Sequence, residues 1–217
     1  MAEKILILAK SGSGKSTSMR TLDPETTMVI QPKKKRLPFP HTDWKKWDKD
    51  KGEGSIFQTN TFSGIKAVLT KMESVGKKVI VIDDFVYVLA DRVMADIDIK
   101  GYDKWSELAA DFNDLMSHID NMNEDIRVYI MTHTDEDDMG RIRMKTAGKL
   151  IDNLLTPEGM FTIVLGMTKN DSGSFFITNG GSMTPYKSPM DMWKDKQIPN
   201  DLKAVDDRIC EFYDIKK

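Results

Sequence analysis

A glycine-rich turn near the start of the chain has the composition of a phosphate-binding loop. An apolar run at residues 5–9 leads into it, and the turn ends in Gly14, Lys15 and Ser16. Glycines let backbone N–H groups converge on phosphate oxygens, the lysine reaches the β- and γ-phosphates, and the hydroxyl that follows binds Mg²⁺. Ala9 stands where the strict motif has glycine, and a small residue is compatible with the start of the turn. We therefore expect ATP and Mg²⁺ as cofactors, with the nucleotide bound by Ser11, Gly12, Ser13, Gly14, Lys15, Ser16 and Thr17.

Two adjacent carboxylates follow a second apolar run, at residues 79–82. We expect Asp83 to bind Mg²⁺ together with Ser16, and Asp84 to orient or deprotonate the attacking water. Asp84 has a second interpretation, because an aspartate directly before a helix at Phe85 is also a typical N-cap. A phosphate-binding loop upstream favours the catalytic interpretation.

Polar residues also end the strand predicted at residues 126–132. Nucleotide hydrolases with an extra strand between the phosphate-loop strand and the aspartate strand have a polar residue here that senses the γ-phosphate or its water. Thr132 and His133 are both candidates for this catalytic role, and the sequence does not choose between them. The four acids at 135–138 are typical of a solvated turn, although they also resemble a metal-ligand cluster.

Two basic clusters are candidate contacts for a nucleic-acid backbone. The first follows the acidic turn, where we expect a loop that enters a helix to present Arg141, Arg143, Lys145 and Lys149 to single-stranded DNA. A solvated helix start explains the same charges. The second cluster, at residues 33–36, precedes Trp44 and Trp47; these rings suit either base stacking or local packing. A nuclear import signal is the generic interpretation of such a run.

The chain alternates between strand-like and helical segments, which predicts a doubly wound α/β fold with a mainly parallel sheet and helices on both faces. Apolar stripes indicate helices around residues 65–72, 85–94 and 108–119. Two regions interrupt the alternation: an irregular, proline-containing insertion at 32–54 and a hairpin extension at 172–189. The predicted strands are residues 5–9, 27–31, 79–83, 126–132 and 160–167.

Composition is that of a soluble α/β protein. The 217 residues are 40% hydrophobic and 30% charged, which suits a single domain over 1–217. We see no leader and no run near the roughly 18 apolar residues of a membrane span, so we expect a cytoplasmic protein without a membrane partner. The lone Cys210 excludes an internal disulfide, and a net charge of -2 argues against coating nucleic acid by bulk charge.

Several short motifs together resemble the phage-encoded RecA-like ATPases of the single-strand annealing and recombination type, which are AAA-like ATP-binding proteins. The resemblance covers most of the chain, and its order and spacing are specific. It rests on KSGSGKST at residues 10–17, LPF at 37–39, VIDDF at 81–85, GYDKW at 101–105, THT at 132–134, KTAGK at 145–149, KSPM at 187–190 and IPNDL at 198–202.

This resemblance implies a RecA-like core and Mg²⁺-dependent ATP binding, with slow hydrolysis stimulated by DNA. It also implies work on single-stranded DNA in phage replication or recombination, beside a phage single-strand-binding protein in the host cytoplasm. A homo-oligomer is common among such ATPases. By the same resemblance, Lys187 is a nucleotide contact in its own or a neighbouring subunit. RecA has a catalytic glutamate after its second core strand, where this chain has Gln31, so the base role moves to Asp84.

Two other functions share the phosphate loop. A nucleotide or small-molecule kinase would have an arginine-rich lid, for which the basic loop at 141–149 is the candidate, whereas the paired Asp83 and Asp84 argue against it. A nucleotide-gated binding module with little turnover fits the missing glutamate.

Overall fold

Parallel strands form the centre of the sheet in a computed structural model of the chain, which describes residues 1–98, 103–147 and 155–216. The phosphate-loop strand β1 (Glu3–Ala9) lies between β5 (Arg127–Glu136) and β7 (Ile163–Asn170). On its far side β5 pairs with β4 (Val79–Ile82), followed by β2 (Thr27–Gln31) and β3 (Ile56–Gln58). An extra strand, β5, therefore separates the phosphate-loop strand from the strand that ends at Asp83.

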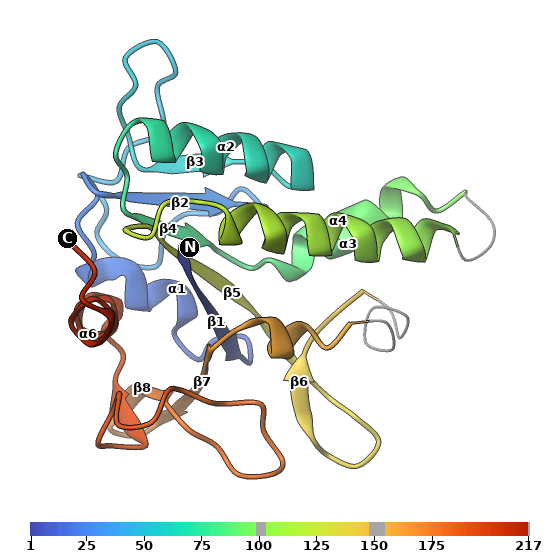
Figure 1. Cartoon of the computed structure of the whole chain (residues 1–217), viewed down its shortest axis with the longest axis vertical. Helices are drawn as coiled ribbons and strands as arrows, with labels where there is room; N and C mark the ends of the chain where they lie inside the picture. The colour runs from blue at the N-terminus through green and yellow to red at the C-terminus, as the bar shows by residue number, and fades with distance from the viewer. Residues whose placement is uncertain (99–102, 148–154, 217) are drawn as a thin grey trace.

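Short antiparallel strands complete the sheet (Figure 1). β8 (Gly173–Ile177) pairs with β7, and β9 (Gln197–Pro199) pairs with β8. β6 (Ile142–Met144) folds back on the end of β5. The predicted hairpin at 172–189 is present only in part, because this range supplies one strand, β8, which pairs with β7 and β9 and widens the sheet instead of leading the chain away from it.

Helices cover both faces because the central strands are apolar on both sides. One face packs against α2 (Phe62–Ser74), α3 (Val86–Ala95) and α4 (Asp103–Asp120). The other packs against α1 (Lys15–Ser18), the 3₁₀ turn η1 (Met19–Thr21) and α6 (Leu202–Tyr213). A further 3₁₀ turn, η2 (Pro157–Met160), precedes β7. The predicted doubly wound α/β arrangement is confirmed.

Helix α6 was not predicted from the sequence, although the residues around 201–209 have the cap and the apolar spacing of a helix. Asp201 accepts a hydrogen bond from the backbone N–H of Ala204, and Leu202, Val205 and Ile209 are buried at helical spacing. The short strands β3, β6 and β9 were also missed, because three residues carry little periodicity.

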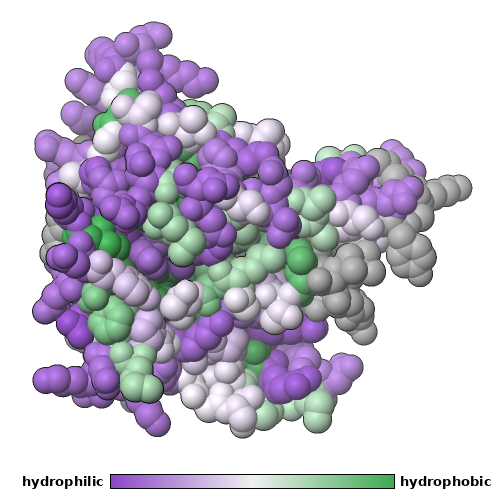
Figure 2. All heavy atoms as spheres, in the orientation of Figure 1, coloured by the Kyte–Doolittle hydropathy of each residue, from purple (hydrophilic) through white to green (hydrophobic). Residues whose placement is uncertain are grey.

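The segment at 32–54 is irregular, as expected, yet part of it belongs to the core. Leu37 and Trp44 are buried against the face that also carries α1 and α6, and the rings of Phe39 and Trp44 meet edge to face. The tip of the segment projects at the top of the view in Figure 2, where the surface is hydrophilic. Within the described ranges, no helix combines the length and the apolar character needed to cross a bilayer.

Candidate functional site

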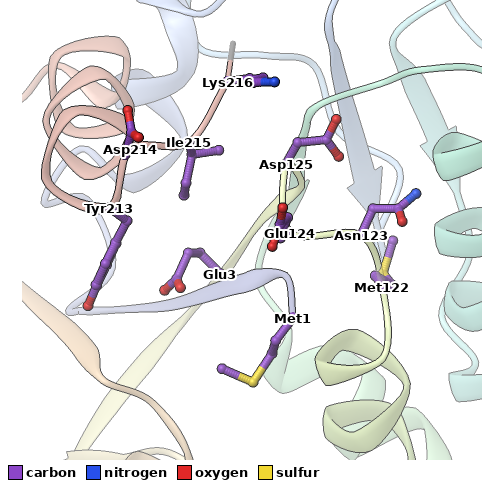
Figure 3. Close-up of a pocket in the computed structure, with 10 residues that line it drawn as sticks. All are labelled: Met1, Glu3, Met122, Asn123, Glu124, Asp125, Tyr213, Asp214, Ile215 and Lys216. Carbon is purple, nitrogen blue, oxygen red and sulfur yellow. The ribbon is translucent and has the colours of Figure 1, made fainter.

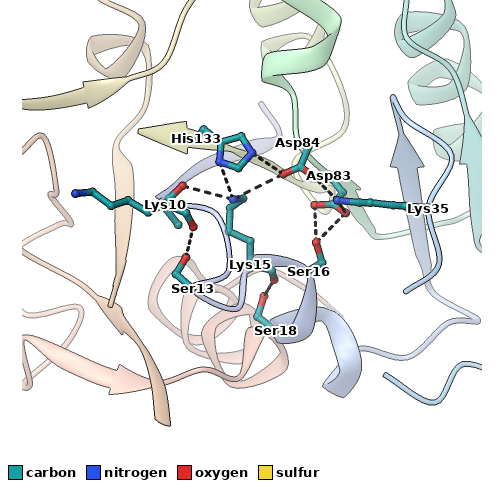
Figure 4. A network of polar contacts seen from close by, with 10 residues as sticks. Lys10, Ser13, Lys15, Ser16, Ser18, Lys35, Asp83, Asp84 and His133 are labelled. Atoms are coloured by element: carbon teal, nitrogen blue, oxygen red, sulfur yellow. Dashed lines mark hydrogen bonds and ion pairs between the residues drawn. The ribbon is translucent and has the colours of Figure 1, made fainter. Parts of the chain in front are cut away.

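Three of the predicted catalytic residues, Lys15, Asp84 and His133, meet at the carboxyl ends of three neighbouring strands. Ala9 at the end of β1 is in register with His133 of β5, and Ile82 of β4 is in register with Ile130 of the same strand. The phosphate loop, Asp83, Asp84 and His133 therefore lie together (Figure 4), at the edge where open α/β sheets bind ligands.

Lys15 lies at the centre of this group. It is 6% exposed, and its Nζ lies 3.4 Å from the carbonyl oxygen of Ala9, 3.4 Å from Nδ1 of His133 and 3.7 Å from Oδ1 of Asp84. Burial lowers the pKa of Lys15, although the charges of Asp84 and Asp83 oppose this shift. Because these contacts are long, the ammonium group is able to bind a phosphate oxygen at closer range.

Backbone conformation in the phosphate loop depends on its glycines. Gly12 and Gly14 have φ values of 78° and 102°, which L side chains rarely adopt. The Oγ atoms of Ser13 and Ser18 donate hydrogen bonds of 2.6 Å to the carbonyls of Lys10 and Lys15, respectively. The helix that we expected after the loop is only four residues long before the 3₁₀ turn begins, so backbone N–H groups and Lys15 must supply most of the attraction for phosphate.

Ser16 and Asp83 form the candidate metal site. The Ser16 hydroxyl lies 3.0 and 3.1 Å from the two carboxylate oxygens of Asp83, whose side chain is fully buried. Burial raises the pKa of Asp83 above its usual range, against the opposing charge of Lys35. Hard oxygen donors from one hydroxyl and one carboxylate fit Mg²⁺, which takes its other ligands from phosphate and water. No larger cluster of metal-binding side chains occurs in the described part of the chain.

Asp84 faces the site and does not cap the following helix. Phe85 is the N-cap position of α3, which has no side-chain cap, and Asp84 itself has a φ of 55°. Its carboxylate contacts Lys35 and lies 3.7 Å from Nζ of Lys15 and 3.6 Å from Nε2 of His133. Burial acts to raise the pKa of Asp84, but the hydrogen bond and charge of Lys35, with Lys15 and His133, hold it below its usual value. The capping interpretation is therefore wrong.

His133 is the polar residue of β5 that contacts the site. Burial and the charge of Lys15 lower the pKa of His133, which keeps its ring neutral at pH 7. Thr132 is completely buried on the opposite face of the strand, since neighbouring side chains alternate, and its Oγ1 makes no hydrogen bond within the described residues.

Lys35 is a site residue that sequence reasoning missed. Its Nζ lies 3.2 Å from Oδ2 of Asp83 and also contacts Asp84. β2 pairs in parallel with β4, and the backbone N–H of Asp83 donates to the carbonyl of Ile30 at 2.9 Å. The basic run after β2 therefore emerges beside the two aspartates, a proximity that requires knowledge of the strand order.

Asn200 was also missed. Its side-chain Nδ2 donates to the backbone carbonyl of Gly14 at 3.2 Å. Its backbone carbonyl accepts a 2.8 Å hydrogen bond from Nη1 of Arg20. The C-terminal segment between β9 and α6 thereby holds the phosphate loop.

Arg141 and Arg143, the first residues of the basic strip predicted for DNA, lie on the hairpin that β5 and β6 form. Arg141 pairs with Asp137 at 2.7 Å, and Arg143 lies 3.9 Å from Asp135, so acids of the preceding turn face both arginines. The backbone N–H of Lys145 donates to the carbonyl of His133 at 2.8 Å, which connects this hairpin to the site. Lys149 lies outside the described residues.

Lys187 lies on an exposed segment whose backbone pairs with Val164 of β7. Among the described residues no hydrogen bond or ion pair joins its side chain to the phosphate loop, and its nucleotide contact stays a prediction. The large cavity in Figure 3, about 880 Å³, is at the other end of the sheet beside Glu3 and Asp125. It is therefore separate from the phosphate loop.

Comparisons with known proteins give matches to solved structures at low sequence identity. No family model and no curated protein matches the chain. Among solved structures, a KaiC-like protein, PH0186, from Pyrococcus horikoshii OT3 is 11% identical with a TM-score of 0.46, covering 90% of this chain and 88% of that one. The P4 protein from bacteriophage phi6, solved in complex with ADP, is 14% identical with a TM-score of 0.40, covering 83% of this chain and 58% of that one.

The order of the parallel strands, with β5 between the phosphate-loop strand and the strand of Asp83, is the one expected of the RecA-like P-loop fold that the sequence predicts.

Proposed function

We propose that this chain is an Mg²⁺-dependent ATPase that acts on single-stranded DNA. The observation that carries the ATPase part is the convergence of two contact groups at one edge of the sheet. Lys15, Asp84 and His133 lie within hydrogen-bond or ion-pair distance of one another, and Ser16 lies within hydrogen-bond distance of Asp83. These are the groups that phosphoryl transfer needs: a cation for the phosphates, a metal site and a carboxylate for water.

Catalysis by these residues would consist of positioning and electrostatic stabilisation. Lys15 would bind the β- and γ-phosphates, and Ser16 with Asp83 would hold the metal. Bound Mg²⁺ supplies further neutralisation of the phosphate oxygens. Asp84 would orient the water and accept its proton, and His133 would hold Asp84 and Lys15 in place. Because its neighbours lower the pKa of Asp84, this carboxylate is a weak base, which agrees with slow hydrolysis.

The DNA part of the proposal is supported by the hairpin that continues β5. Arg141, Arg143 and Lys145 follow directly from His133, so a change at the γ-phosphate can reposition them. We expect ATP to order this hairpin and thereby change its grip on DNA, as in other γ-phosphate switches. Equal affinity for single-stranded DNA with ATP, with ADP and without nucleotide would contradict this coupling.

The biological setting is proposed from the motif resemblance alone. The resemblance supports a role in phage replication or recombination in the host cytoplasm. It also supports a phage single-strand-binding protein as partner and assembly into a homo-oligomer. Lys149 and Lys187 keep their predicted roles within this proposal, whereas the sensor role goes to His133 because Thr132 is buried on the opposite face of β5.

Steady-state ATP hydrolysis with Mg²⁺, with and without single-stranded DNA, tests the function, using Lys15→Ala as the blank. Turnover that DNA stimulates and that Lys15→Ala abolishes is the expected result. Phosphate transfer to mononucleotides would instead identify a kinase. ATP binding without turnover would identify a nucleotide-gated binding module.

A further inference from the structure

A second cavity, of about 410 Å³, lies next to the nucleotide site and is strongly basic. The segment after β2 and the neighbouring strand β3 form its walls. The lining residues that could bind an anion are Gln31, Lys34, Lys35, Arg36, His41 and Lys46. No aspartate or glutamate lines it. The local potential is therefore positive, although the chain as a whole carries a net charge of -2.

Most of the lysine and arginine side chains that line this cavity have no ion-pair partner among the described residues. Lys33, just outside it, pairs with Asp91 at 2.7 Å, and Lys35 pairs with Asp83 and Asp84. By contrast, no hydrogen bond or ion pair within the described ranges involves the side chains of Lys34, Arg36 or Lys46. Three unpaired cations around one cavity repel each other, so an anion would stabilise their arrangement.

Gln31 provides an independent indication of a ligand. It is 2% exposed at the end of β2, it lines the cavity, and its Nε2 makes no hydrogen bond in the part of the chain that the structure describes. A buried amide donor without an acceptor costs free energy, and a small rotation of the side chain toward the cavity would let a bound anion oxygen accept its hydrogen bond.

We propose that this cavity binds phosphate groups of a single-stranded nucleic acid, an inference that rests on the proposed action on DNA and adds a backbone site to it. Trp44 also lines the cavity, but it is only 7% exposed and packs edge to face on Phe39, so its ring is not a stacking platform. The groups that would contact the nucleic acid are the cationic side chains and the amide donor of Gln31. Binding here is therefore to the backbone and independent of base sequence.

Fluorescence anisotropy of a labelled oligo(dT) across a salt series tests the site in the full chain. The cavity variant is Lys34→Ala/Arg36→Ala/Lys46→Ala. The matched control is Lys51→Ala/Lys194→Ala/Lys196→Ala, which removes the same charge from exposed lysines outside the cavity. We expect the cavity variant to bind about tenfold or more weakly at low salt, with a salt slope shallower by roughly 2. The affinity of the control variant for oligo(dT) should stay within about twofold of the wild-type affinity.

ATP binding by each variant provides the folding check, since none of these six residues contacts the phosphate loop. Equal losses in both triple variants would overturn the inference, because general charge would then explain them. Displacement of oligo(dT) by free dTMP at the same nucleotide concentration would also overturn it, in favour of a mononucleotide site. So would displacement by polyglutamate at equal charge, in favour of an acidic protein partner.

Failure of this inference differs from failure of the proposed function. If Arg141→Ala/Arg143→Ala/Lys145→Ala loses DNA binding and the cavity variant keeps it, only the cavity assignment is wrong. If the wild-type chain hydrolyses ATP and binds no oligonucleotide, the cavity assignment and the DNA part of the proposed function both fall, and the ATPase part remains.

Discussion

The ammonium group of Lys35 lies 3.2 Å from Oδ2 of Asp83, a carboxylate with no exposed surface. The same ammonium contacts Asp84. Two adjacent carboxylates, one of them fully buried, are costly without a counter-charge, and Lys35 supplies it at the position where Ser16 and Asp83 would hold Mg²⁺. Lys35 and a metal bound there would therefore have overlapping electrostatic roles.

Lys35→Ala should destabilise the metal-free protein, because it leaves Asp83 buried without its cation. Lys35 is partly exposed, so we expect a loss on the order of 1–3 kcal/mol in the free energy of unfolding. Urea denaturation with EDTA measures it, and added Mg²⁺ should stabilise the variant more than the wild type. Lys34→Ala is the control. An equal response to Mg²⁺ in all three proteins would show that Lys35 and the metal do not share the site.

Asp84→Asn should slow ATP hydrolysis by about 10²–10⁴-fold, since an amide cannot accept the proton of the attacking water. ATP affinity should change little, because Lys15 and the loop backbone make the phosphate contacts. Single-turnover hydrolysis and equilibrium binding separate the two effects. Asp91→Asn, which removes a carboxylate paired with Lys33, is the control. Unchanged turnover in Asp84→Asn would assign the base role to another group.

Gly14→Ala should damage the phosphate loop more than Gly12→Ala does. Both glycines have positive φ, but a Cβ at Gly14 would lie 2.7 Å from Nδ2 of Asn200, whereas one at Gly12 meets nothing within 4 Å. Conformational strain of roughly 1–2 kcal/mol is common to both variants, and the clash is added only at Gly14. ATP affinity and thermal unfolding provide the comparison. The same Cβ would lie 3.0 Å from Oγ of Ser174, so the relieving variant is Asn200→Ala/Ser174→Ala. If it fails to relieve part of the Gly14→Ala defect, the clash is not its cause.

Asp206→Asn should destabilise the fold by about 3–5 kcal/mol, because it breaks a buried ion pair. Asp206 accepts hydrogen bonds of 2.9 and 2.7 Å from Nε and Nη2 of Arg127 and one of 2.7 Å from the Tyr129 hydroxyl. Chemical denaturation measures the loss. Glu211→Gln on the same helix breaks an exposed pair with Arg208, and it should cost no more than about 1 kcal/mol. Similar losses in both variants would contradict this difference.

His133 should make stability fall in mild acid. Burial and the charge of Lys15 lower the pKa of His133 in the folded state, so below pH 6.5 the unfolded chain binds more protons than the folded one. The stability that His133 contributes is complete above pH 6.5 and is lost as the pH falls through its lowered folded-state pKa.

Urea denaturation at about pH 7.5 and about pH 5.5 measures this contribution, with His133→Gln as the comparison. The decrease in wild-type stability between the two pH values should be larger than that of the variant. Parallel decreases would exclude His133 as their source.

Local patterns in the sequence determined much of this protein. The strand before Gly12, the apolar run that ends at Asp83, and the alternation of strands and helices are properties of neighbouring residues, so they could be predicted without the structure. The α/β fold and the phosphate-loop, Asp83 and Asp84 positions follow from such patterns, as do the two alternatives Thr132 and His133.

Tertiary structure decided the relationships between distant segments. The pairing of β2 with β4 places Lys35 at the aspartates, and the alternation of side chains across β5 turns His133 toward Lys15 and Thr132 away. The return of the chain after β9 places Asn200 on Gly14. Strand order and register depend on packing over the whole sheet, which no local pattern contains, and they fix which charges and donors meet at the site.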